Sequence, residues 1–118
     1  MSQPLTADQE RLLAAIVALE AGRTFDGNEP ALNHGLISQL IGIEGEPGDG
    51  PWQVRLVARD APRIALSDGP LLGRYWVGVD RQGEIVVRVR DGLLVSMEYA
   101  WSGAEPTGWP EPGDIVTD

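Results

Sequence analysis

Apolar residues recur at a helical spacing near the start of the chain and at a strand spacing in its second half. Residues 7–21 carry four apolar side chains on one helical stripe: Leu12, Leu13, Ile16 and Leu19. Thr6 and Gln9 match a capping box at the start of this segment, and Gly22 suits its end. We therefore expect an amphipathic helix over residues 7–21 that covers a sheet.

The stretch that follows has a weaker pattern. Residues 34–44 fit either a short helix followed by a strand or one irregular strand, and we favour a strand over residues 37–44. Glycine and proline then predict a loop over residues 45–51. His34 has no serine, cysteine or second histidine at a catalytic or metal-ligating spacing, so we expect a surface or locally hydrogen-bonded side chain.

Alternation of apolar and polar residues begins at Trp52 and predicts a half-buried strand over residues 52–58. Ile64 and Leu66 predict a shorter strand, and Pro62 places it at a sheet edge because proline has no N–H to donate. Three longer strands are expected at about residues 73–80, 84–90 and 93–101. Together these segments predict an antiparallel meander.

Two matching turns set how the last three strands pair: Arg81-Gln82-Gly83 and Arg90-Asp91-Gly92. We interpret each as a three-residue loop with its glycine in the left-handed conformation. This register predicts four core pairs, which are Val79 with Ile85, Val77 with Val87, Val87 with Val95 and Ile85 with Met97. A two-residue turn at Asp91 and Gly92 would instead pair Val89 with Leu94, and it would place polar groups opposite the core residues.

The same register predicts three rows on the opposite face of the sheet. They are Trp76 with Arg88 and Leu94, then Gly78 with Val86 and Ser96, then Asp80 with Glu84 and Glu98. The first row would form an amphipathic patch of the kind found at protein interfaces. The alternatives are that the helix covers this face or that Trp76 and Arg88 form a simple stacking pair at the surface.

The third row would bring three carboxylates together, which is unfavourable without a nearby cation. Such carboxylates could bind a divalent cation, accept arginine or lysine from a partner, or perform acid–base chemistry. A solvated sheet end, with Arg81 and Arg90 relieving the repulsion, is the simpler interpretation.

Prolines from Ser102 onward predict a tail without regular structure, although Trp109 and Ile115 indicate that it packs back on the domain. We expect Trp52, Trp101 and Trp109 to serve as core or tail anchors rather than as ligand-stacking residues.

The composition of the chain limits the classes of function that it can perform. The 118 residues fit one domain, residues 1–118, and the absence of cysteine excludes disulfides and thiol chemistry. The net charge of −9 disfavours nucleic acid and favours basic partners. Residues 52–101 carry six acids and seven arginines, whereas both flanks are acidic. No segment has the pattern of a signal peptide or a membrane span, so a cytoplasmic protein is expected. The glycines at residues 42–45 do not match a dinucleotide or phosphate loop, and we expect no cofactor.

Residues 87–99, Val-Arg-Val-Arg-Asp-Gly-Leu-Leu-Val-Ser-Met-Glu-Tyr, are followed by Glu105-Pro106 and by the acidic proline motif at residues 109–112. This pattern resembles small uncharacterised actinobacterial proteins in which a strand-Asp-Gly-strand-Leu-Glu pattern leads into a proline-rich acidic tail. The resemblance singles out Glu98. Many of these proteins have an upstream Gly-Cys-Gly-Cys segment, but residues 42–51 here contain no cysteine, which removes any metal or redox role of that segment.

We therefore predict an α+β domain with five to six antiparallel strands, one N-terminal helix and a proline-rich tail. The predicted function is a non-enzymatic protein-binding domain of the immunity or regulatory type that recognises a basic partner. The predicted binding residues are Trp76, Arg88, Leu94, Asp80, Glu84 and Glu98. The alternatives are a small-ligand or metal-binding protein or an enzyme with a carboxylate site near Glu98, and a self-assembling protein that pairs an edge strand near residues 62–67.

Overall fold

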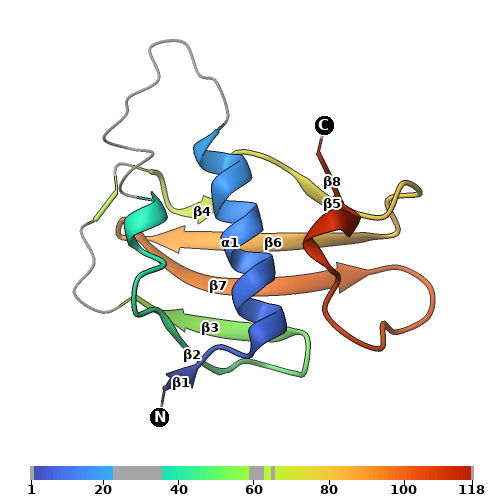
Figure 1. The fold of residues 1–118 in the computed structure, drawn as a ribbon, viewed down its shortest axis with the longest axis horizontal. Coiled ribbons are helices and arrows are strands. Elements are labelled where there is room, and N and C mark those ends of the chain that lie inside the picture. Colours follow the sequence, from blue (N-terminus) through green and yellow to red (C-terminus); the bar gives the residue numbers. More distant parts are fainter. Residues whose placement is uncertain (1, 23–35, 59–62, 65, 118) are drawn as a thin grey trace.

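One helix lies across one face of an eight-stranded antiparallel sheet, so the fold is α+β (Figure 1). The computed structural model describes residues 2–22, 36–58, 63–64 and 66–117. His34 and Pro62 lie outside the described residues. The sheet has more strands than the five to six predicted, because short strands at its edges add to the central ones.

Helix α1 spans Ala7–Ala21, as predicted. The Thr6 hydroxyl accepts a hydrogen bond from the Gln9 backbone N–H at 3.2 Å, and the Gln9 side chain accepts one from the Thr6 N–H at 3.1 Å. These two bonds satisfy N–H groups that have no partner within the helix. The stripe facing the sheet consists of Leu12, Leu13, Ile16, Val17 and Ala21, all of which are buried.

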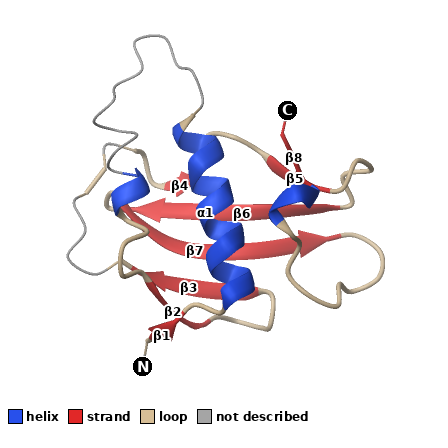
Figure 2. Ribbon diagram, viewed as in Figure 1, coloured by secondary structure: helices blue, strands red, loops and turns tan. Residues whose placement is uncertain are grey.

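The strands form one continuous sheet in the order β1-β2-β3-β7-β6-β5-β8, with β4 paired to β6 beside this path (Figure 2). Their bounds are β1 Gln3–Pro4, β2 Glu44–Pro47, β3 Gln53–Val57, β4 Gly69–Pro70, β5 Tyr75–Val77, β6 Gly83–Arg90, β7 Leu93–Trp101 and β8 Ile115–Thr117. The long central strands β6 and β7 are the two with the clearest alternation in the sequence.

The strand favoured over residues 37–44 is wrong. Residues 36–38 are helical, residues 39–42 form a turn, and β2 begins only at Glu44. The reason lies in the side chain of Gln39, which is fully buried against the β6–β7 hairpin. The Gln39 side chain donates to the Gly92 carbonyl at 2.7 Å and accepts from the Leu94 N–H at 2.8 Å. The turn at residues 39–42 therefore positions Gln39 to satisfy buried backbone groups of the hairpin.

The predicted edge strand at Ile64 and Leu66 is absent from the described part of that segment. Ile64 is buried, and its N–H donates to the Gly92 carbonyl at 2.9 Å. This bond, together with one from the Arg63 guanidinium to the Asp91 carbonyl, ties the segment to the β6–β7 turn without forming a ladder. The strand beside the end of β6 is β4, where Gly69 lies opposite Val89.

The predicted register of β6 and β7 is also wrong. Asp91 and Gly92 form a two-residue turn in which both φ angles are positive, 52° and 76°. Val89 therefore faces Leu94. A β-bulge then places one extra residue, Val95, on β7, so that Arg88 faces Ser96 and Val87 faces Met97. The bulge keeps Val87 opposite Met97 in the core although the turn is shorter than predicted, whereas Val95, predicted to pair with Val87, is only half-buried.

The turn between β5 and β6 is longer than predicted. Val77 pairs with Gly83 and Tyr75 with Ile85, so residues 78–82 form the connection. Val79 was predicted to lie in the core and is instead 93% exposed. Gly78 and Arg81 adopt positive φ angles of 77° and 55° in this loop. Gly83, by contrast, lies within β6, where an added Cβ would come within 2.7 Å of the Tyr99 ring.

The tail is more regular than predicted. The last proline begins a 3₁₀ helix, η1, which spans Pro112–Asp114, and β8 then adds an edge strand to β5 with Val116 opposite Trp76. The proline-free Ile115–Thr117 segment can donate to a ladder, which the proline-rich part before it cannot. Trp109 and Ile115 pack against the core, which confirms that the tail folds back on the domain.

Candidate functional site

The face of the sheet opposite α1, which we call the open face, carries the residues that alternate with the core. Three cross-strand rows run over it: Arg55, Ser96 and Arg88; Gln53, Glu98 and Val86; and Ala100, Glu84, Trp76 and Val116. All of these side chains are half-buried or exposed. The open face therefore mixes charged groups with partly exposed apolar ones, whereas the covered face is apolar.

Trp76 is the largest side chain on the open face, and two arginines lie over its ring. The Arg74 guanidinium is 4.3 Å from the ring centroid and that of Arg81 is 5.5 Å away. Arg74 also binds both carboxylate oxygens of Glu84 at 3.0 Å. A bidentate pair restricts the guanidinium to one orientation, so the stacked position over Trp76 is held in place.

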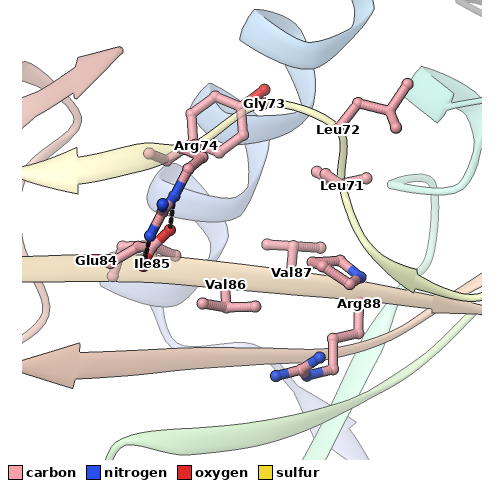
Figure 3. Close-up of a pocket in the computed structure, with 11 residues that line it drawn as sticks. Leu71, Leu72, Gly73, Arg74, Glu84, Ile85, Val86, Val87 and Arg88 are labelled. Atoms are coloured by element: carbon pink, nitrogen blue, oxygen red, sulfur yellow. Dashed lines mark hydrogen bonds and ion pairs between the residues drawn. The ribbon is translucent and has the colours of Figure 1, made fainter. Parts of the chain in front are cut away.

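A hollow of about 370 Å³ opens beside this group, between β6 and the segment that joins β4 to β5. Figure 3 shows Arg74 and Glu84 paired at one end of the hollow and Arg88 at the other. The Leu71 N–H donates to the Val87 carbonyl at 2.9 Å where the segment leaves β6. Arg88 is exposed, so its guanidinium is available to a partner.

The structure separates several residues that the sequence had placed together. Leu94 is fully buried in the core and does not reach the open face, because the bulge at Val95 reverses its direction. Trp76 faces Glu84 rather than Arg88, and these two β6 residues are four positions apart, roughly 13 Å along the strand. Leu94 is thus removed from the predicted patch.

The predicted row of three carboxylates does not form. Glu84 and Glu98 lie in different rows of the open face, and Asp80 lies in the loop of residues 78–82. Within the described ranges, no group of three or more histidine, cysteine, aspartate or glutamate side chains is arranged to hold a metal ion. Glu84 instead neutralises Arg74.

A second cluster, which we call the aromatic notch, lies where β7 extends beyond β3. It is a hollow of about 380 Å³ lined by residues 49–53 and 98–101. Trp52 is central: its ring centroid is 5.7 Å from that of Tyr99, 6.2 Å from Trp101 and 5.8 Å from Trp109, all in edge-on contact. Its indole N–H donates to Glu105 at 2.8 Å. Trp52 and Trp109 pack on the core as predicted, whereas Trp101 is 38% exposed.

Tyr99 is nearly buried where its ring contacts that of Trp52. Burial raises the pKa of its hydroxyl above the ordinary value of 10, and the negative charge of Asp114 raises it further. The phenol therefore stays neutral across the physiological range.

Sequence reasoning missed Arg74, Asp49 and Glu105, and it did not place Arg81 beside Trp76. Arg74 could have been found, because it is two residues before Trp76 and two-residue spacing places side chains on one face of a strand. The other three lie in loops whose approach to Trp76 or Trp52 depends on tertiary folding.

None of the described helices is long and apolar enough to cross a membrane. Comparison with family models, curated proteins and solved structures finds no match to this chain. The resemblance to the actinobacterial proteins therefore stays a prediction, and the function has to be argued from the site itself.

Proposed function

We propose that this chain is a protein-binding domain that recognises a basic partner protein through the open face of its sheet, with Trp76 at the centre of the contact. The observation that carries the proposal is Trp76 itself, partly exposed on the face opposite α1 and stacked with Arg74 and Arg81.

The residue types on the open face support this proposal. Tryptophan and arginine are enriched at protein interfaces and among the residues whose loss most weakens binding. Val86 and Val116 add partly exposed apolar area in the same rows as Glu98 and Trp76. The bidentate pair of Arg74 with Glu84 reduces the entropy lost when Trp76 is covered, because the guanidinium is already ordered.

Charge supports the basic nature of the partner. The net charge of −9 attracts positively charged proteins and raises their rate of encounter. All of the excess acid lies outside residues 52–101, so the long-range field is negative while the contact itself is mixed. An immunity or regulatory protein that neutralises a basic partner fits this combination.

The test is affinity capture from the native host with the purified chain as bait, in wild-type form and as Trp76→Ala. The matched control is Val79→Ala, since Val79 is more exposed than Trp76 but lies in the loop beside the open face. We expect one host protein to be retained by the wild type and by Val79→Ala, to be reduced at least tenfold on Trp76→Ala, and to be released by salt.

Equal retention on Trp76→Ala and the wild type contradicts the proposed contact. Retention that does not weaken between low and high salt contradicts the basic partner, because attraction between exposed charges is screened over about 10 Å at 0.1 M salt.

A further inference from the structure

We infer that one row of the open face, Arg55, Ser96 and Arg88, binds a phosphate group in its doubly charged form. We call these three residues the arginine row. Ser96 on β7 lies directly opposite Arg55 on β3 and directly opposite Arg88 on β6, so the serine is flanked by an arginine on each side. This inference goes beyond the proposed function, because the row can bind a phosphate group without a partner protein.

The three side chains of the arginine row point to the same side of the sheet. Side chains alternate between the two faces along a strand, and the chain neighbours of these residues are buried in the core: Val54, Met97 and Val87. Both arginines are exposed, and Ser96 is half-buried. Ser96 reaches this face because of the bulge at Val95, since without the extra residue it would face Val87.

Neither arginine of the row is neutralised within the described part of the chain. The two guanidiniums and the Ser96 hydroxyl make no hydrogen bond or ion pair there. Several other described arginines do have a carboxylate or carbonyl partner, namely Arg11, Arg63 and Arg74. Two positive charges on either side of one position are unfavourable until an anion lies between them.

Two acids lie beside the row but leave its arginines unpaired. Glu46 on β2 faces Arg55, and Glu98 is two residues beyond Ser96 on β7. Neither carboxylate forms an ion pair with a described arginine. The arginines therefore remain available to an external anion, and the two acids limit the affinity of the row for it.

The spacing of the row fits one phosphate group. Neighbouring strands lie about 4.8 Å apart, so the Cα atoms of Arg55 and Arg88 are separated by about 10 Å with Ser96 midway. Figure 3 shows the Arg88 side chain reaching from β6 over the neighbouring strand, which is β7. An anion above Ser96 is thus within reach of both guanidiniums and of the hydroxyl.

The number of donors favours phosphate over a carboxylate. One guanidinium satisfies both oxygens of a carboxylate in a bidentate pair. Two guanidiniums and a hydroxyl offer more donors than that, and a phosphate monoester has three terminal acceptor oxygens and a charge of about −1.5 to −2 at pH 7. The net charge of −9 disfavours a polyanion such as nucleic acid, so the ligand is a single phosphate group, free or carried by a side chain of another protein.

The experiment is an NMR titration of the full chain at constant ionic strength. The probes are inorganic phosphate, the peptide acetyl-Gly-phosphoserine-Gly-amide, and acetate as the carboxylate control. We expect both phosphates to shift the Ser96 amide signal and the Nε–H signals of Arg55 and Arg88, and acetate to bind about fivefold more weakly. Tighter binding of the peptide than of inorganic phosphate assigns the ligand to a phosphorylated side chain, and the reverse order assigns it to free phosphate.

Variants locate the site. Arg55→Gln and Arg88→Gln should each weaken phosphate binding about fivefold, whereas Glu46→Gln should strengthen it about twofold, because it removes a negative charge beside the row. The matched control is Arg11→Gln, which removes the same charge from an exposed position of α1 on the other side of the sheet and should leave phosphate binding unchanged. Thermal unfolding of every variant confirms that it is folded.

Three results overturn the inference. The first is acetate binding as tightly as phosphate. The second is equal weakening by Arg11→Gln and Arg88→Gln, which means that only the overall charge matters. The third is a titration in which the Ser96 amide signal does not shift to saturation, or in which binding persists in both row variants. The titration needs no partner protein, so its outcome is independent of the capture test.

Discussion

The two faces of the sheet use polar residues in opposite ways. On the covered side, Glu20 of α1 and Gln39 of the turn before β2 are nearly or fully buried, and they bond to backbone groups and to the Tyr75 hydroxyl of this same chain. On the open face, Arg88 and Glu98 remain partly or fully accessible to solvent. Polar groups on the covered face therefore stabilise the fold, while those on the open face keep their capacity for external contacts. Substitutions should separate in the same way.

Glu20 shows how tightly the covered face is bound together. Its carboxylate accepts the N–H groups of Leu72 at 2.9 Å and Gly73 at 3.0 Å and the Tyr75 hydroxyl at 2.5 Å. These bonds join the last turn of α1 to the segment between β4 and β5. They also offset the desolvation cost of the Glu20 carboxylate, which is only 2% exposed.

The largest loss of stability is therefore expected for Glu20→Ala. It leaves two backbone N–H groups and a tyrosine hydroxyl without their acceptor, which costs about 3 kcal/mol in the free energy of unfolding. Urea denaturation measures the change. The control is Glu10→Ala, at an exposed position of the same helix, and a loss as small as that of the control would contradict the account.

Gln39→Ala should come second, with a loss of about 2 kcal/mol in the free energy of unfolding, because the Gly92 carbonyl and the Leu94 N–H both lose a buried partner. Hydrogen exchange of the Leu94 amide should accelerate as well. Gln82→Ala, at an exposed position, is the control. Unchanged protection of Leu94 would show that Gln39 does not hold the hairpin.

The contact of Gln39 also explains which parts of the fold could be predicted from the sequence. The helix at residues 7–21 and the strands β6 and β7 follow local periodicity and were predicted within one residue. The register of β7 was not, because the two-residue turn and the bulge at Val95 are stabilised by Gln39 from a distant turn. No pattern within residues 83–101 reports that contact.

The candidate site shows the same limit. Alternation was sufficient to place Trp76, Glu84, Arg88 and Glu98 on the face opposite the core. Their neighbours depend on register, so the predicted pairing of Trp76 with Arg88 and the carboxylate row failed together. The predicted position of Leu94 on the open face was wrong for the same reason. The extra residue on β7, Val95, turns the side chains between it and the hairpin turn to the opposite face.

Trp76→Ala should lower the free energy of unfolding by only about 1 kcal/mol. It removes a half-buried ring and its contacts with two arginines, both of which are themselves exposed to solvent. The same urea experiment measures it. A loss of unfolding free energy as large as that of Glu20→Ala would mean that Trp76 stabilises the fold rather than serving external contacts.

The smallest effect is a pH dependence from Tyr99, whose raised pKa favours the neutral phenol in the folded state. The stabilisation is fully present below the ordinary value of 10 and is lost as pH rises through the higher folded-state value. Thermal unfolding between pH 9 and pH 11 should therefore show a steeper loss for the wild type than for Tyr99→Phe. If stability falls equally with pH in the wild type and in Tyr99→Phe, the Tyr99 hydroxyl does not contribute to the pH dependence.

The most direct test of the division between the two faces is a single comparison of partner capture by Trp76→Ala and Gln39→Ala, at a temperature at which both variants remain folded. We expect that Trp76→Ala, the more stable variant, loses the partner, and that Gln39→Ala, the less stable one, retains it. Capture that follows stability instead, with Gln39→Ala losing the partner and Trp76→Ala retaining it, would contradict the assignment of the open face as the binding surface.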